Sequence, residues 1–254
     1  MTEFSIVIPA RYASSRLPGK MLRDVAGKTL IERVIDQALA CEVQDAVVAT
    51  DDERILKVAQ AAGVTAMMTS VDHSNGSERI EEVVRRLQWS DDRIVVNLQG
   101  DEALVPREHL EKVAQVCDCS GADVATLAVP IESPDEVFDP NAVKVVLAAS
   151  GDALYFSRAP IPWNRQTFVD NSGVLGTGHV YLRHIGLYAM RVGALKRLVA
   201  APVCSLEVTE SLEQLRFLHA GARVQVAVID EAAPPGVDTE QDLQRVIATI
   251  EAGQ

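Results

Sequence analysis

Residues 5–20, SIVIPARYASSRLPGK, decide the fold class, because a short run without polar alternation leads directly into a basic, glycine-containing loop. The run Ser5–Ile8 is typical of a strand buried on both faces of a parallel sheet. Two further runs of this kind occur at Ala46–Ala49 and Ile94–Asn97. Apolar residues at helical spacing lie between these runs, at Leu30–Ala40, Asp52–Ala62 and Ser77–Leu87. This repetition predicts an α/β fold, with a mainly parallel sheet and helices on both faces.

The second half of the chain changes character. A helix is predicted over Pro106–Cys117 and a strand over Val124–Val129. Five prolines and a glycine-rich stretch at 173–178 then predict a smaller irregular or antiparallel insertion over approximately residues 130–190 of a single domain, residues 1–254. The remaining predicted elements are strands at Val143–Ala148 and His184–Met190, a helix at Leu206–Ala220, a strand at Val224–Ile229 and a last helix that begins after Thr239.

Composition restricts the classes of ligand. The 254 residues include 36 acidic and 24 basic side chains, so the formal net charge is −12. Nucleic acids and anionic membranes bind basic surfaces, so we expect neither as a partner, and an anionic ligand needs a local cluster of cations. No apolar run approaches the roughly 18 residues of a membrane span. The N-terminus, MTEFSIVIPAR, lacks the basic region of a signal peptide.

The cysteines indicate a reducing compartment. Their spacing fits neither a disulfide framework nor a paired C-x-x-C zinc site. We expect reduced, buried thiols at Cys41, Cys117, Cys119 and Cys204. This cysteine usage suits a cytoplasmic enzyme.

The loop after the first strand can bind a polyphosphate. It offers three cations within ten residues, with small residues between them: Arg11, Arg16 and Lys20, with Ser14, Ser15 and Gly19. Ligands of open α/β sheets bind beyond the carboxyl ends of the strands, where this loop lies. Backbone N–H groups and cations together hold phosphates. The alternative is a basic surface loop that merely follows a strand.

Two common nucleotide motifs are absent. A Walker A loop needs a glycine five residues before its Gly-Lys pair, but Ser14 and Leu22 stand at those positions. No G-x-G-x-x-G follows a strand, since Tyr181 stands where a third glycine would follow Gly176 and Gly178. The sequence therefore disfavours a P-loop hydrolase and an NAD-dependent oxidoreductase.

Two carboxylates are candidate magnesium ligands. Asp101 follows the third strand in Asn97–Glu102, after Gly100, which lets the backbone approach a ligand. Asp238 precedes the last helix, where a plain helix cap or turn is the alternative role. Mg²⁺ prefers one or two protein carboxylates, with phosphate oxygens and water completing its octahedron.

Seven ordered blocks resemble the 3-deoxy-manno-octulosonate cytidylyltransferase (CMP-octulosonate synthetase) family. They read IPARYASSRLPGK, VATDDERI, VVNLQGDE, FSRAPIPW, RHIGLY, LEQLR and PGVDTEQDL, and they span nearly the whole chain. The resemblance implies a Rossmann-like nucleotidyltransferase fold, an inserted subdomain for dimerisation and sugar binding, and a homodimer. It also implies transfer of CMP from CTP to the anomeric hydroxyl of 3-deoxy-D-manno-octulosonate, with release of pyrophosphate, for lipopolysaccharide biosynthesis.

The resemblance also implies residue roles. Arg11, Ser14 and Lys20 would contact the CTP triphosphate, with Arg16 nearby and Gln99 beside the nucleotide. Asp101 and Asp238 would bind Mg²⁺, the implied cofactor. The catalytic group would consist of Lys20, Arg11, Asp101 and Asp238. The sugar acid would be held by Arg165, His184, Tyr188, Glu213 and Gln214.

Periodicity supports part of this sugar site. In the predicted strand His184–Met190, His184, Gly186 and Tyr188 share one face, although a core His and Tyr with satisfied hydrogen bonds would show the same pattern. In the predicted helix 206–220, the apolar residues Val208, Leu212 and Leu215 form the buried stripe. Glu210, Glu213 and Gln214 lie on the opposite face, which is usually solvated, so an insertion or a partner subunit must fold over them.

The chain departs from the family's usual pattern at a few positions. Asn75 and Ser77 stand where the family usually has Ser and Thr, and Asn75 enlarges a side chain near the base or sugar. Met21 and Ala103 replace usual prolines, so two loops lose rigidity. Each replacement lowers the stability of the fold by about 1 kcal/mol or less. No departure removes a charged group.

Three alternatives remain at the level of sequence. A cytidylyltransferase for another sugar acid, such as sialic acid, would lack the QGDE block. An 8-amino form of the octulosonate stays open, because one side chain can decide between an amine and a hydroxyl. A nucleotide-binding sensor without turnover would have little need for two carboxylates and a full sugar site.

Overall fold

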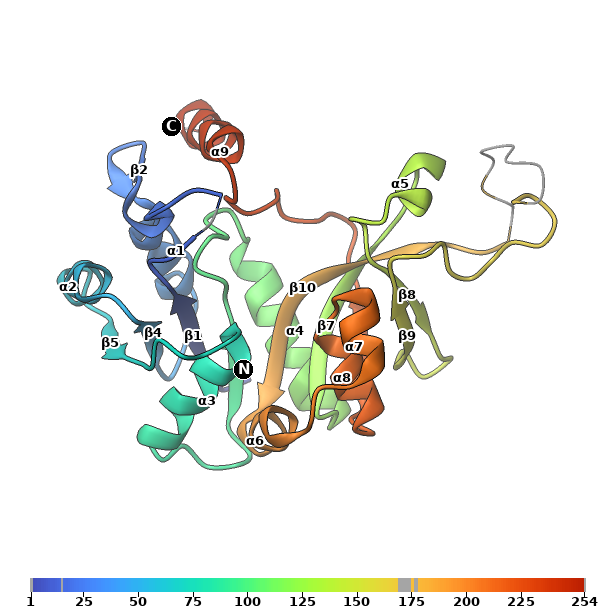
Figure 1. Ribbon diagram of the computed structural model, residues 1–254, viewed down its shortest axis with the longest axis horizontal. Coiled ribbons are helices and arrows are strands. Elements are labelled where there is room, and N and C mark those ends of the chain that lie inside the picture. The colour runs from blue at the N-terminus through green and yellow to red at the C-terminus, as the bar shows by residue number, and fades with distance from the viewer. Residues whose placement is uncertain (1, 15, 169–174, 176–177, 254) are drawn as a thin grey trace.

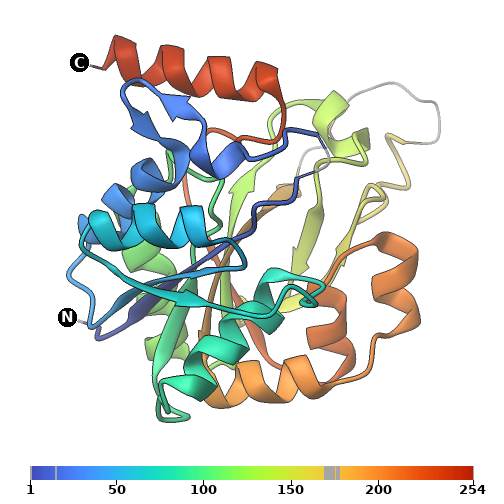
Figure 2. The ribbon, with the colours of Figure 1, turned by 60° about the vertical axis from the view of Figure 1, so that its left-hand side comes forward.

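The computed structural model describes residues 2–14, 16–168, 175 and 178–253, so Ser15 and most of the glycine-rich stretch lie outside the described residues. A central sheet runs in the order β11-β7-β10-β6-β1-β4-β5, with helices on both faces (Figure 1, Figure 2). Its strands are β1 (Ser5–Ala10), β4 (Ala46–Thr50), β5 (Thr65–Met68), β6 (Ile94–Asn97), β7 (Val124–Pro130), β10 (Leu182–Arg191) and β11 (Val224–Val228).

The sheet is mainly parallel, as predicted. Strand β1 pairs in parallel with β4 and β6, β4 with β5, and β7 with β11. Strand β10 runs antiparallel between β6 and β7. The carboxyl ends of β1 and β6 therefore meet at one edge, which is where ligands bind in open α/β sheets.

Helices cover both faces because each buries an apolar stripe. On one face of the sheet, the core cluster contains buried residues of α1 (Leu30–Leu39), α2 (Glu53–Ala61), α4 (Arg107–Ser120) and α9 (Glu240–Ala252). On the opposite face, a second core cluster contains buried residues of α3 (Gly76–Arg86) and α6 (Val192–Ala200). Ile6 and Ile8 of β1 point into the first cluster and Val7 into the second, which explains the absence of alternation in the sequence of β1.

Shorter elements complete the chain. They are η1 (Lys20–Leu22), the hairpin of β2 (Asp24–Val25) and β3 (Lys28–Thr29), α5 (Pro134–Phe138), β8 (Lys144–Leu147) and β9 (Ala153–Ser157). Strand β8 pairs antiparallel with β9 and β10. The described part of residues 158–181 extends from the body as an arm (Figure 1). The expected division into one domain with an insertion at about 130–190 stays a prediction.

A bulge in β10 opens the sheet beside the predicted sugar residues. Gly186 and Leu187 have no partner in the register with β7. Because the bulge adds two residues, His184 and Tyr188 stay on one face, as expected. The Thr126 hydroxyl stabilises the bulge, since it lies 2.9 Å from each of two bulge carbonyls and 3.0 Å from His184 Nε2.

The predicted helix over Leu206–Ala220 is wrong. The chain forms α7 (Ser205–Glu210) and α8 (Gln214–His219), separated by Ser211 with φ of 52°. This left-handed residue turns α8 away from the line of α7, so the expected apolar stripe does not exist. Val208 is 67% exposed, whereas Gln214, expected on a solvated face, is 5% exposed.

The prediction of reduced, buried cysteines is confirmed for three of the four residues. All four are free thiols, and Cys41, Cys117 and Cys204 are buried as expected, but Cys119 is exposed near the end of α4. Over the described ranges, none of the helices combines the length and the apolar character that crossing a bilayer requires.

Candidate active site

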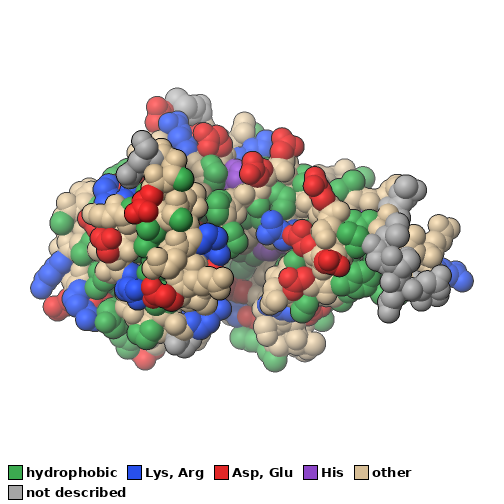
Figure 3. All heavy atoms as spheres, turned by 90° about the horizontal axis from the view of Figure 1, so that it is seen from above, with side chains coloured by type: hydrophobic (Ala, Val, Ile, Leu, Met, Phe, Trp, Pro, Cys, Tyr) green, Lys and Arg blue, Asp and Glu red, His purple; other side chains and the backbone are tan. Residues whose placement is uncertain are grey.

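A cavity of about 230 Å³ opens where β1 and β6 end. Seen from this end of the molecule, side chains of both charges surround a hollow (Figure 3). The cavity brings together seven residues singled out from the sequence: Arg11, Ser14, Arg16, Lys20, Gln99, Asp101 and Asp238. They come from the loop after β1, the turn after β6 and the segment before α9, so three distant parts of the chain meet here.

Lys20 lies between the two candidate metal-binding carboxylates. Its Nζ donates hydrogen bonds to Asp101 Oδ2 at 2.7 Å and Asp238 Oδ1 at 3.0 Å. It also donates to the Val237 carbonyl at 2.9 Å, and the residue is 7% exposed. Arg16 pairs with the other oxygen of Asp238 at 2.9 Å. The fold therefore already gathers both carboxylates around one positive charge.

This pair of carboxylates fits a hard divalent cation that arrives with a polyphosphate. Among the residues with described positions, no group of three or more His, Cys, Asp or Glu side chains is arranged so that it could hold a metal ion. A cation at Asp101 and Asp238 would therefore draw its other ligands from phosphate oxygens and water, which is the usual coordination of Mg²⁺.

Gly100 lines the cavity, and its missing side chain also allows two segments to pack closely. A Cβ at this position would lie 2.9 Å from the Pro9 carbonyl oxygen and 3.1 Å from Met21 Sδ. The missing side chain thus makes room for the Pro9 carbonyl of β1 and the Met21 side chain of η1. The close packing of these two segments sets the place of Asp101 relative to Lys20.

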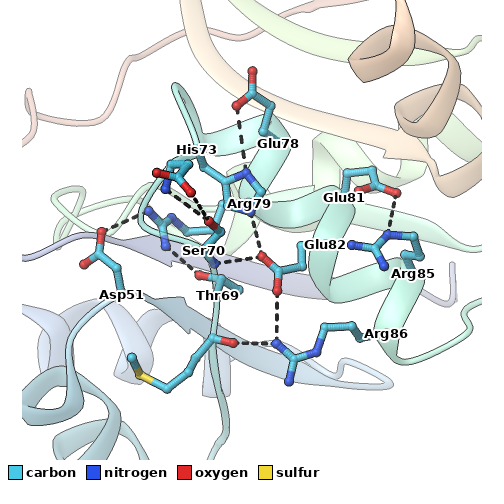
Figure 4. A network of polar contacts seen from close by, with 12 residues as sticks. Asp51, Thr69, Ser70, His73, Glu78, Arg79, Glu81, Glu82, Arg85 and Arg86 are labelled. Carbon is cyan, nitrogen blue, oxygen red and sulfur yellow. Dashed lines mark hydrogen bonds and ion pairs between the residues drawn. The ribbon is translucent and has the colours of Figure 1, made fainter.

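Sequence reasoning missed most of the second wall of the cavity, which precedes and begins α3. This wall contains His73, Ser74, Asn75, Gly76 and Arg79. Asn75 Oδ1 caps α3 by accepting a hydrogen bond from the backbone N–H of Glu78 at 2.9 Å. His73 Nε2 lies 2.7 Å from Glu82 Oε2 (Figure 4). The one signal in the sequence was the departure at position 75, which suggested a place near the base or sugar.

Four of the five predicted sugar residues gather beside this wall. The His184 and Tyr188 rings lie 5.4 Å apart, and Gln214 is buried at the start of α8. The Ser77 side chain of α3 lies close enough to Glu213 to act against the rise in the pKa of its carboxyl. Burial lowers the pKa of His184 to about 3 and raises the pKa values of Tyr188 and Glu213. The cluster therefore favours neutral side chains, which recognise hydroxyl groups by hydrogen bonds.

Arg165 lies apart from both groups. It is exposed on the arm and does not line the cavity. The expected contact between Arg165 and the same ligand stays a prediction.

Comparisons with known proteins identify a family that this chain matches. A family model described as cytidylyltransferase matches residues 5–225. The 3-deoxy-manno-octulosonate cytidylyltransferase of Xanthomonas campestris pv. campestris (strain B100) is 50% identical over 248 residues, which are 97% of this chain and 88% of that protein. The same enzyme of Thioalkalivibrio sulfidiphilus is 50% identical over 251 residues, 98% of this chain and 99% of that protein.

A solved structure is similar along the entire chain. It is a CMP:2-keto-3-deoxy-manno-octonic acid synthetase complexed with CTP, with a TM-score of 0.90 and 40% sequence identity. The match covers 100% of both chains.

Proposed function

Because this chain belongs to the cytidylyltransferase family, we propose that it transfers CMP from CTP to the anomeric hydroxyl of 3-deoxy-D-manno-octulosonate and releases pyrophosphate. The observation that carries the proposal is the cavity itself, where the three cations of the basic loop, Arg79 and two carboxylates meet at the carboxyl end of the sheet. The product is an activated sugar for lipopolysaccharide biosynthesis. Relatives at 50% identity bear the name of this enzyme.

The basic loop would hold the triphosphate. Arg11, Ser14 and Lys20 line the cavity together with Arg16, and Gln99 of the turn after β6 lines it as well. Phosphoryl transfer depends mainly on positioning and on neutralising charge at the phosphate oxygens. In a chain of net charge −12, this local excess of cations supplies that neutralisation. The anomeric hydroxyl attacks the α-phosphorus, and the bond to pyrophosphate breaks.

Mg²⁺ is the proposed cofactor, held by Asp101 and Asp238. When bound, it would neutralise phosphate charge and lower the pKa of a coordinated hydroxyl. Lys20 contacts both carboxylates, so it orients them toward each other.

The sugar acid would lie beside α3. Its hydroxyl groups would meet the neutral His184 and Tyr188 side chains and the polar start of α8, at Glu213 and Gln214. Arg165 is the one cation in the proposed set, so it would pair with the sugar carboxylate. That contact requires the arm to approach the body or a second subunit to supply it.

The active form is proposed to be a homodimer in the cytoplasm. Exposed apolar side chains gather on β9, the arm and α7: Leu154, Trp163, Val180, Leu206 and Val208. A second copy of the chain would cover such a surface. The cytoplasm is where CTP is available as substrate.

Pyrophosphate release tests the function directly. The chain is incubated with Mg²⁺, CTP and 3-deoxy-manno-octulosonate, beside the 8-amino sugar, sialic acid and the other three nucleoside triphosphates. Release confined to CTP with the octulosonate is expected. Release of pyrophosphate with a different sugar acid would overturn the sugar assignment. If the chain binds CTP but releases no pyrophosphate with any combination of nucleotide and sugar, it is a nucleotide-binding sensor and not an enzyme.

A further inference from the structure

One buried carboxylate joins the two walls of the nucleotide cavity. The first wall is the basic loop, residues 11–20, and the second is the turn and first helical residues at 73–79. Asp51 belongs to neither wall and follows β4, the strand beside β1. Its side chain is 13% exposed, and each of its oxygens bonds to a different wall.

The first contact fixes the basic loop. The backbone N–H of Tyr12 donates to Asp51 Oδ1 at 3.0 Å. Tyr12 in turn closes the loop on itself, because its carbonyl accepts from the N–H of Gly19 at 3.3 Å. A Cβ on Gly19 would lie 3.1 Å from the Tyr12 ring, and the Arg54 guanidinium lies 3.7 Å from the ring centroid. Asp51 thus fixes Tyr12, which is the chain neighbour of Arg11 and bonds to Gly19, the chain neighbour of Lys20.

The second contact fixes the start of α3. Arg79, which lines the cavity and is 4% exposed, pairs with Asp51 Oδ2 through Nη2 at 3.0 Å. Its Nη1 donates to the Thr69 hydroxyl at 2.5 Å, as Figure 4 shows. The Thr69 hydroxyl donates to the Thr50 carbonyl at 3.1 Å. Arg79 is therefore anchored to the ends of two adjacent strands.

We propose that Asp51 and Arg79 are positioning residues that set the separation of the two cavity walls, and so the affinity for the nucleotide. The inference rests on the proposed function, which supplies CTP as the ligand. A carboxylate that bonds a backbone N–H and a buried guanidinium at once holds both partners in fixed geometry. His184 and Tyr188 lie on β10 and Gln214 begins α8, so these sugar residues belong to neither wall, and α3 reaches the sugar cluster through Ser77 and Glu213. We therefore expect the pair to act mainly on CTP.

The test is Asp51→Asn, which keeps the size of the side chain but places a donor against a donor. In either orientation of the amide, its NH2 group faces a donor, the Tyr12 N–H or the Arg79 guanidinium. We expect the Kd for CTP, measured by titration calorimetry with Mg²⁺ and no sugar, to rise about tenfold or more. The KM for the sugar acid at saturating CTP is expected to stay within about twofold. A merely structural loss would change both constants together.

Asp45→Asn is the matched control. Asp45 pairs with Arg93 at the other end of β4, so the variant loses a comparable Asp–Arg contact far from the cavity. Its CTP affinity is expected to equal that of the wild-type chain. If Asp51→Asn does not fold, Asp51→Glu replaces it, because the longer side chain cannot serve Tyr12 and Arg79 in the same geometry.

The outcomes separate the inference from the proposed function. A wild-type chain that binds no CTP would overturn both. Wild-type affinity in the Asp51 variant, or equal losses in the Asp51 and Asp45 variants, would overturn the inference alone. An equal rise of the CTP and sugar constants would also overturn it.

Discussion

At the scale of single residues, Asp101 carries the sharpest prediction. Its carboxylate lies 2.7 Å from Lys20 Nζ in the cavity, where the proposed Mg²⁺ needs a negative ligand. Asp101→Asn keeps the shape but removes the charge, so kcat for pyrophosphate release should fall at least about 100-fold. Thermal unfolding should change little, because the side chain is partly exposed. Unchanged turnover would refute the metal assignment.

A surface carboxylate provides the control for that variant. Asp91 pairs with Lys196 and its side chain is 72% exposed. Exposed ion pairs contribute little to stability, so Asp91→Asn should leave both turnover and thermal unfolding unchanged.

His184 should make the fold sensitive to acid. Burial lowers its pKa to about 3, below the ordinary value of about 6.5 in the unfolded chain. As the pH falls from about 6.5 toward 3, the unfolded chain takes up the proton and the native chain does not, so His184 costs stability, by at most about 1.4 kcal/mol per pH unit. Above pH 6.5 this cost is absent.

Urea unfolding between pH 7 and pH 4.5 measures the effect. His184→Gln should reduce the loss of unfolding free energy over this interval, whereas the exposed His219→Gln should not. The same acid dependence in the His184 variant as in the wild-type chain would contradict a buried, neutral imidazole.

The residues of the cavity could be predicted only where position along a strand revealed them. Arg11, Lys20 and Asp101 follow apolar strands, and the parallel sheet brings their strand ends together. Asp51 also follows a strand, but its partner Arg79 lies 28 residues away in the sequence. Arg79 is on a helix whose sequence pattern does not indicate a functional residue. Pairing across elements depends on their packing, which one sequence does not reveal.

At the scale of elements, the corner between α7 and α8 decides the place of Glu213 and Gln214. Ser211 adopts φ of 52° there, a conformation that costs an ordinary L-residue roughly 1 kcal/mol. Ser211→Gly should therefore raise the free energy of unfolding by about 0.5–1 kcal/mol, measured by urea titration. Ser205→Gly, at the helical start of α7, should lower it. A destabilised Ser211 variant would argue against the left-handed corner.

This corner also shows why the fold was only partly predictable. Continuous apolar runs located β1, β4 and β6, and the Thr239 cap located α9, because those signals are local. No glycine or proline marks the break at Ser211, so periodicity extended one helix through it. Strand β5 was missed because its sequence, TAMM, lacks a β-branched run, and because its two end residues are exposed and its two middle residues only partly buried.

At the scale of the whole molecule, five exposed large apolar side chains lie on the arm, β9 and α7: Leu154, Trp163, Val180, Leu206 and Val208. These three elements lie at the side of the molecule away from α2 and β5 (Figure 1). Trp163 on the arm is 57% exposed. Large aromatic side chains at that exposure commonly anchor interfaces, and the proposed homodimer gives this one a partner.

Trp163→Asp should therefore weaken self-association. Burying an unpaired carboxylate in an interface is unfavourable, so the dimer dissociation constant should rise at least about tenfold, measured by sedimentation velocity over a concentration series. Leu39→Asp, at the exposed end of α1 on the body, should leave it unchanged. If the wild-type chain is a monomer, or both variants dissociate alike, the apolar arm is not the interface, and Arg165 must reach the sugar within its own subunit.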